Sequence, residues 1–124
     1  MLLVNPSLLP KIRSRALLDA CKDMPCALRV ASFIPGHKCA AQDTVVGCHV
    51  GNLGRGMGTK VSDLSVAAGC HACHDLIDGR DNRVRWVIDQ YPFAFAERLM
   101  HGVFETQARW VAMGLIEVKG MEIL

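Results

Sequence analysis

The stretch that decides the fold is residues 70–78, which read Cys-His-Ala-Cys-His-Asp-Leu-Ile-Asp. Cys70 and Cys73 have the spacing that lets two thiolates bind one zinc ion. His74 follows directly and must point elsewhere, because a side chain one residue on cannot comfortably share the same tetrahedral site. One short segment can therefore serve two metals, one that builds the fold and one that does chemistry.

Six cysteines in 124 residues indicate either disulfides or metal binding. The apolar residues 1–4 precede the first basic residues, which is the reverse of a secretory signal, so we expect reduced thiols and favour metal. Because thiolate binds zinc more tightly than imidazole in closed sites, His37 is the lesser alternative to Cys39 as a ligand. Four cysteines can thus be grouped around one zinc ion: Cys26, Cys39, Cys70 and Cys73.

The bulk composition is that of one small globular domain. The chain is 51% hydrophobic, enough to bury a core, and has no run of about 20 uncharged apolar residues that could span a membrane. Its net charge of +2 is weak evidence for an anionic partner. The basic residues gather in two clusters: Lys11, Arg13 and Arg15, then Arg80, Arg83 and Arg85. We expect a cytoplasmic protein.

The hydrophobic pattern predicts an α+β fold. An amphipathic helix is expected near the C-terminus, and Gly114 is a natural end for it. Its apolar stripe indicates core packing or a partner surface and is compatible with a homodimer. The expected elements are a helix over 11–22, strands over 27–34 and 43–50, a helix from 70 or 72 to 77 or 78, an extended or helical segment over 82–90, and the final helix over about 93–114.

Residues 26–80 resemble a small phage and prophage family of HNH-like nucleases, the YbcO-like family. The resemblance implies a single domain over residues 1–124, in which a ββα-metal core over about 22–90 carries a structural zinc site between flanking helices. The matching pieces are Cys26-Ala-Leu-Arg, Cys48-His49-Val50, Gly56-Met57-Gly58-x-Lys60-x-x-Asp63-Leu64 and Cys70-x-x-Cys73-His74-Asp75-x-Ile77-Asp78-Gly79-Arg80.

The resemblance also implies roles for three residues. His49 matches the general base near the end of a hairpin strand, although taken alone it would be interpreted as a strand or core histidine. Asp63 stands at the position that orients the base in the family pattern. The alternative interpretation is that Asp63 caps a short turn before Leu64. His74 matches the helix-borne ligand of a catalytic metal. The same resemblance assigns the four grouped cysteines to the structural zinc.

One position departs from the common HNH pattern. Many of these enzymes carry Asp or His directly before the base, as a second metal ligand, and here that residue is Cys48. Asp78 lies four residues after His74, hence on the same helical face, and either binds the metal or hydrogen-bonds His74. The catalytic metal is therefore left open among Mg²⁺, Mn²⁺ and Zn²⁺.

The expected function is a metal-dependent DNA endonuclease acting in phage or prophage DNA processing or recombination in a bacterial host cell. Arg80, Lys60 and Arg83 are the candidate phosphate contacts. The alternative is a non-catalytic zinc-stabilised module that binds DNA or a protein. The pair His49 and His74 discriminates the two, because a binding module needs neither.

Overall fold

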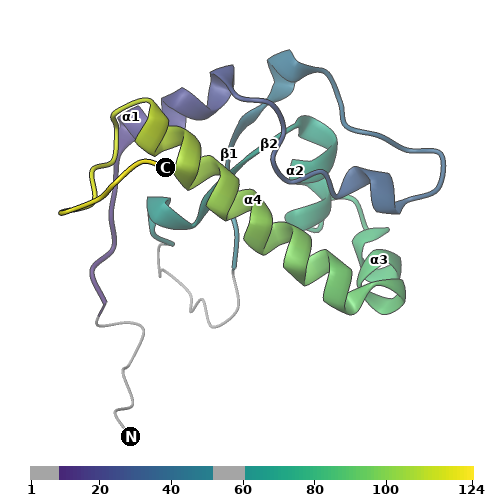
Figure 1. The fold of residues 1–124 in the computed structure, drawn as a ribbon. Helices are drawn as coiled ribbons and strands as arrows, with labels where there is room; N and C mark the ends of the chain where they lie inside the picture. The colour runs from purple at the N-terminus through teal and green to yellow at the C-terminus, as the bar shows by residue number, and fades with distance from the viewer. Residues whose placement is uncertain (1–8, 52–60) are drawn as a thin grey trace, which may run out of the picture.

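The computed structural model describes residues 9–51 and 61–124, which form helices around one small sheet (Figure 1). Short 3-10 helices carry the label η. The elements in chain order are α1 (Arg15–Ala20), η2 (Cys21–Asp23), η3 (Ala31–Phe33), η4 (Gln42–Thr44), β1 (Val46–His49), η5 (Asp63–Ser65), β2 (Val66–Gly69), α2 (His71–Ile77), α3 (Val84–Gln90) and α4 (Pro92–Ala112).

The sheet has two antiparallel strands, with Val46 opposite Gly69 and His49 opposite Val66. Helix α2 begins immediately after β2, and Cys70 between them is its N-cap residue in an extended conformation. The order strand, strand, helix therefore places residues 70–78 at the end of the hairpin.

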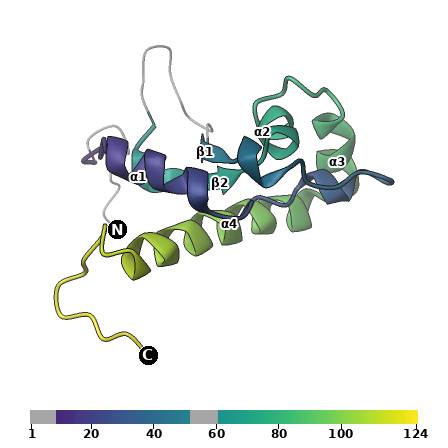
Figure 2. The same ribbon diagram turned by 90° about the horizontal axis from the view of Figure 1, so that it is seen from above.

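Helix α4 covers the sheet and the free edge of β2. Figures 1 and 2 show it running the length of the molecule, past β2, from α3 at its start to α1 near its end. Gly102 lets α4 approach the backbone at Ala27 closely, because a Cβ atom at residue 102 would lie 3.0 Å from the carbonyl oxygen of Ala27. The hydroxyl of Thr106 accepts a 3.0 Å hydrogen bond from the backbone N–H of Ala68, which points away from β1.

The buried apolar residues form one core cluster, to which both strands and the helices α1 to α4 contribute. Trp110 is its largest fully buried side chain, and its indole N–H donates a 3.0 Å hydrogen bond to the carbonyl of Leu17. This contact ties the end of α4 to α1. None of the helices in the described part of the chain combines the length and the apolar character that a membrane span requires.

The expected α+β class is confirmed, and several expected elements differ. The prediction of a strand over 27–34 is wrong, because that segment is a loop with the short helix η3. The strand that pairs with β1 is Val66–Gly69. The backbone N–H of Ala27 donates to the carbonyl of Ala68 (2.7 Å), so the loop crosses the edge of β2 without joining the sheet.

Two elements are also shorter than expected. The first helix begins at Arg15, because the side chain of Ser14 accepts a hydrogen bond from Leu17 N–H and caps it. Within 43–50 only Val46–His49 is a strand. By contrast, α3 and α4 lie close to the predicted ranges 82–90 and 93–114.

Replacing Thr106 with valine tests the link between α4 and β2. The valine is nearly isosteric but leaves the buried N–H of Ala68 without an acceptor, so we expect a loss of about 1–3 kcal/mol in the free energy of unfolding. Urea denaturation measures it, with Thr106→Ser as the control that keeps the hydroxyl. A valine variant as stable as the unmodified protein would contradict this role.

Candidate metal centre and histidine pocket

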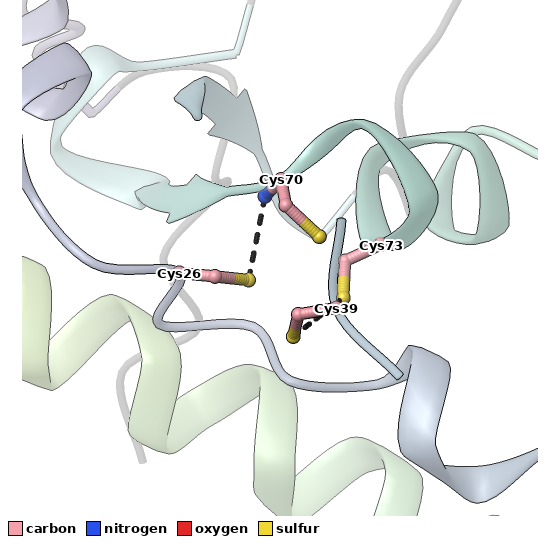
Figure 3. Close-up of side chains that lie close together, drawn as sticks. All are labelled: Cys26, Cys39, Cys70 and Cys73. Atoms are coloured by element: carbon pink, nitrogen blue, oxygen red, sulfur yellow. Dashed lines mark hydrogen bonds between the residues drawn. The ribbon is translucent and has the colours of Figure 1, made fainter. Parts of the chain in front are cut away.

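Four cysteine sulfurs converge on one point (Figure 3). Cys70 and Cys73 come from the start of α2, while Cys26 and Cys39 come from separate loop segments. All four Sγ atoms lie within 4.8 Å of one another, and those of Cys39 and Cys73 are 3.8 Å apart. A tetrahedral zinc with Zn–S bonds of about 2.3 Å needs sulfur separations of about 3.8 Å. The cluster can therefore hold one metal ion such as zinc.

Backbone N–H groups already point at these sulfurs. Ala31 N–H lies 3.4 Å from the sulfur of Cys73, Ala40 N–H lies 3.3 Å from that of Cys70, and the N–H of Cys70 lies 3.3 Å from that of Cys26. Such donors orient thiolate ligands and stabilise their negative charge. The backbone at Ala31 and Ala40 thus supplies hydrogen-bond donors to the cysteine sulfurs of α2.

The electrostatics of the cluster favour a cation. Hydrogen bonding, chiefly from the Cys73 thiol, lowers the pKa of Cys26 to about 4. Burial first, and then the neighbouring charges of Cys26 and Cys70, raise the pKa of Cys39 to about 12. Four sulfurs this close cannot all ionise unless a positive charge lies among them, which is what a divalent ion supplies.

His37, the alternative ligand, lies outside this cluster. Its Nε2 atom is 2.8 Å from a guanidinium nitrogen of Arg83, and its side chain is exposed. Cys39 instead has its sulfur among the other three. The choice of Cys39 over His37 therefore fits the geometry.

Cys48 cannot easily replace the missing second ligand. It is fully buried, and its thiol lies 3.5 Å from the carbonyl of Val46 and 3.7 Å from that of Gly69. Burial, followed by the charge of Asp78, raises the pKa of Cys48 to about 12. Only thiolates bind metals well, so Cys48 acts as a core residue here.

His49, at the end of β1, is bonded to Asp63 at the start of η5. Their Nε2 and Oδ1 atoms are 2.8 Å apart, and the Asp63 side chain is 9% exposed against 36% for His49. The backbone N–H of Ser14 donates to the other oxygen of Asp63 (2.7 Å). Burial would raise the pKa of Asp63, but the hydrogen bonds from Ser14 and His49 outweigh it, so that pKa is lowered and the group is a carboxylate.

His74 and Asp78 form a second pair, on α2. The Nε2 atom of His74 lies 3.0 Å from Oδ2 of Asp78, as their i, i+4 spacing predicts. Arg80 donates to the same carboxylate (2.9 Å) and lies 3.2 Å from Asp75. Apart from the four cysteines, no group of three or more metal-ligand side chains gathers within residues 9–51 and 61–124.

One surface pocket is lined by one member of each pair. His49 and Asp78 both line a pocket of about 460 Å³, whose other walls are mostly apolar side chains from α2, α3 and α4. A second pocket, of about 620 Å³, also includes His49, together with Arg13, Arg15 and Asp63. His49 therefore lines both a pocket that includes Asp78 and a pocket with basic residues.

The three predicted phosphate contacts have different surroundings. Arg80 lies beside Asp78, and 60% of its side chain is exposed. Arg83 is held by Asp81 (2.8 Å) and His37, away from both pockets that His49 lines. Lys60 and the Gly56-Met57-Gly58 motif lie outside the described residues. Arg13 and Arg15 were not predicted as phosphate contacts, although the sequence shows them in a basic cluster.

The cysteine cluster gives a direct prediction. Binding of a structural zinc is worth about 10–16 kcal/mol in small zinc peptides, more than the stability of roughly 5–15 kcal/mol of most domains. We expect Cys70→Ser or Cys73→Ser to lose the bound metal and to unfold the domain, as measured by metal analysis and thermal melting.

Cys48→Ala is the matched control for that experiment. It removes a buried thiol that lies outside the cluster, so it should keep one tightly bound metal ion per chain. A Cys73→Ser protein with a full metal content and an unchanged melting temperature would contradict the assignment.

Comparison with known proteins adds a family to this geometry. Residues 15–115 match the family described as "Putative nuclease YbcO". At the significance required, neither a curated protein nor a solved structure matched the chain. The family match spans most of the chain, from α1 to just beyond α4, and includes both histidine pairs and all four clustered cysteines. The chain therefore belongs to the YbcO family.

Proposed function

We propose that this protein is a metal-dependent DNA endonuclease of the HNH type, acting in phage or prophage DNA processing or recombination in the cytoplasm of a bacterial host. The observation that carries the proposal is the pocket shared by His49 and Asp78, since Asp78 in turn contacts His74. It brings a base candidate on a strand to the same pocket as a ligand pair on a helix.

The arrangement of elements supports an HNH-like ββα-metal core. Strands β1 and β2 form a hairpin, α2 follows without a linker, and the three residues that the resemblance singles out lie at the end of β1, at the start of η5 and on α2. In this proposal the zinc of Cys26, Cys39, Cys70 and Cys73 is structural, because the cluster holds the start of α2 in the core.

His49 acts as the general base. The contact between its Nε2 atom and the Asp63 carboxylate favours the tautomer with the proton on Nε2, which leaves the lone pair of Nδ1 free. That nitrogen takes the proton of the attacking water as the phosphodiester bond is hydrolysed. Asp63 fixes the ring and stabilises the imidazolium that forms, which is the role of the carboxylate in catalytic His-Asp pairs.

His74 and Asp78 would hold the catalytic ion, whether Mg²⁺, Mn²⁺ or Zn²⁺. When bound there, such an ion supplies positive charge for the scissile phosphate and the departing oxygen. Two protein ligands suffice, because substrate and water oxygens complete the coordination of such an ion. Arg80 beside Asp78 can pair with phosphate oxygens through its guanidinium group.

Substitution of the His-Asp pair tests the proposed base. We expect His49→Ala and Asp63→Asn to stay folded and to nick supercoiled plasmid about 10²- to 10⁴-fold more slowly, because proton transfer from water is lost or misdirected. His101→Ala, on the exposed face of α4, is the matched control and should nick at the unmodified rate. Equal nicking by His49→Ala, or no nicking with any of the three metals, would favour the non-catalytic binding module instead.

Chelation separates the two kinds of metal site. Dialysis against EDTA should abolish nicking while the cysteine-bound ion and the melting temperature persist, because a closed site of four thiolates releases its ion far more slowly than an open one. Mg²⁺, Mn²⁺ or Zn²⁺ added back should restore nicking in the unmodified protein, and much less in His74→Ala. Full nicking in the presence of EDTA, with one ion per chain, would contradict a separate catalytic metal.

A further inference from the structure

The pocket between the N-terminal segment and His49 includes the proposed base and its partner Asp63, but its two arginines have no part in the chemistry described so far. Its volume is about 620 Å³, which is within the range of sites that bind small ligands. It is lined by Arg13, Ser14, Arg15, Leu18, His49, Val61 and Asp63. Two guanidinium groups, two apolar side chains and the edge of the proposed base thus surround one hollow.

The two arginines of this pocket differ from four of the six other arginines among the described residues. Arg29, Arg80, Arg83 and Arg109 each lie within 4.0 Å of a carboxylate oxygen. Arg13 and Arg15 are exposed and have no carboxylate within that distance among the residues that the structure describes. Their charges are therefore available to an anion from solution.

The backbone that carries Arg13 is fixed in place. Ile12 N–H donates to the Ser62 hydroxyl (3.1 Å), Asp63 N–H donates to the Ile12 carbonyl (2.8 Å), and Ser14 N–H donates to the Asp63 carboxylate (2.7 Å). Three hydrogen bonds thus join segment 12–14 to the loop that holds the partner of His49. A fixed backbone lowers the entropy cost of presenting charged side chains to a ligand.

The one carboxylate that lines the pocket does not oppose an anion strongly. Both oxygens of Asp63 are occupied, one by the His49 ring and the other by Ser14 N–H, and the side chain is almost buried. The two arginines therefore leave the pocket with a net positive character. Leu18 and Val61 add apolar surface that suits a sugar or a base.

We infer that this pocket binds a backbone phosphate of a nucleic-acid strand, next to the phosphate that is cut. The inference rests on the proposed function, since it places the neighbouring nucleotide on one side of His49 while the scissile phosphate lies on the side of Asp78 and His74. In this arrangement the strand passes His49, because that residue lines both pockets. Arg13 and Arg15 are binding residues in this arrangement and take no part in proton transfer.

The test measures binding separately from cleavage. Fluorescence anisotropy with a labelled oligonucleotide duplex and the full-length protein, with EDTA present to prevent cleavage, gives affinities over a range of salt concentrations. Each phosphate contact contributes about 0.9 to the slope of log K against log salt for duplex DNA. We expect Arg13→Ala with Arg15→Ala to lower that slope by one to two such contacts and to weaken binding at least fivefold at low salt.

Lys119→Ala is the matched control, because it removes one exposed positive charge from a pocket formed by residues 117–121 alone. Its binding and slope should stay close to those of the parent. In nicking assays with added metal, the double arginine variant should raise KM for plasmid and leave kcat within about twofold. Melting temperatures of all variants establish that they are folded.

Two results would overturn the inference. One is a double arginine variant whose affinity and salt slope equal those of Lys119→Ala. The other is a double arginine variant whose KM for plasmid equals that of the unmodified protein, which would show that neither side chain contacts the strand. Weakened binding together with no cleavage under any metal would instead refute the proposed hydrolysis and keep the phosphate contact.

Discussion

The cluster of four cysteine sulfurs is the constraint on which the rest of the structure depends. Each strand of the sheet has only four residues, and an isolated two-stranded hairpin is marginal in water. The cluster joins the start of α2 to two loops that are distant in sequence, so a metal bound there closes three segments at once. Burial of Cys70 and Cys73 places this linkage within the core rather than on its surface.

Helix α4 extends that constraint across the molecule. Arg29, three residues after Cys26, has a left-handed backbone (φ 51°) and pairs with Glu105 of α4 at 2.7 Å. A non-glycine residue in that conformation is strained and needs support from its surroundings. The ion pair and the bond from Arg29 Nε to the Cys26 carbonyl supply it, so α4 holds the ligand loop as well as the edge of β2.

The parts of the fold that sequence could predict are those set by local chemistry. The spacing of Cys70 and Cys73 and the position of Gly79 define α2 without reference to the rest of the chain. The long amphipathic stripe does the same for α4. Segment 27–34 misled the prediction because its apolar residues are buried as a strand's would be, yet its backbone serves the cysteine cluster and the edge of β2. Strand β2, Val-Ala-Ala-Gly, has small residues because α4 packs closely on it, and such residues carry little strand signal.

The histidine pocket depends on contacts between distant parts of the chain, which a single sequence does not reveal. Asp63 stays ionised and aimed at His49 because Ser14, 49 residues earlier, donates its backbone N–H to it. That same contact brings the basic N-terminal segment into the same pocket as His49, while the hairpin places His49 in a second pocket with Asp78. The position of the base is thus a consequence of two separate constraints, the capped N-terminal segment and the metal-anchored helix. Because the link to Asp63 uses the backbone N–H of Ser14, substitution of the Arg13 and Arg15 side chains should leave the ring of His49 in place, which is why binding and hydrolysis should respond independently.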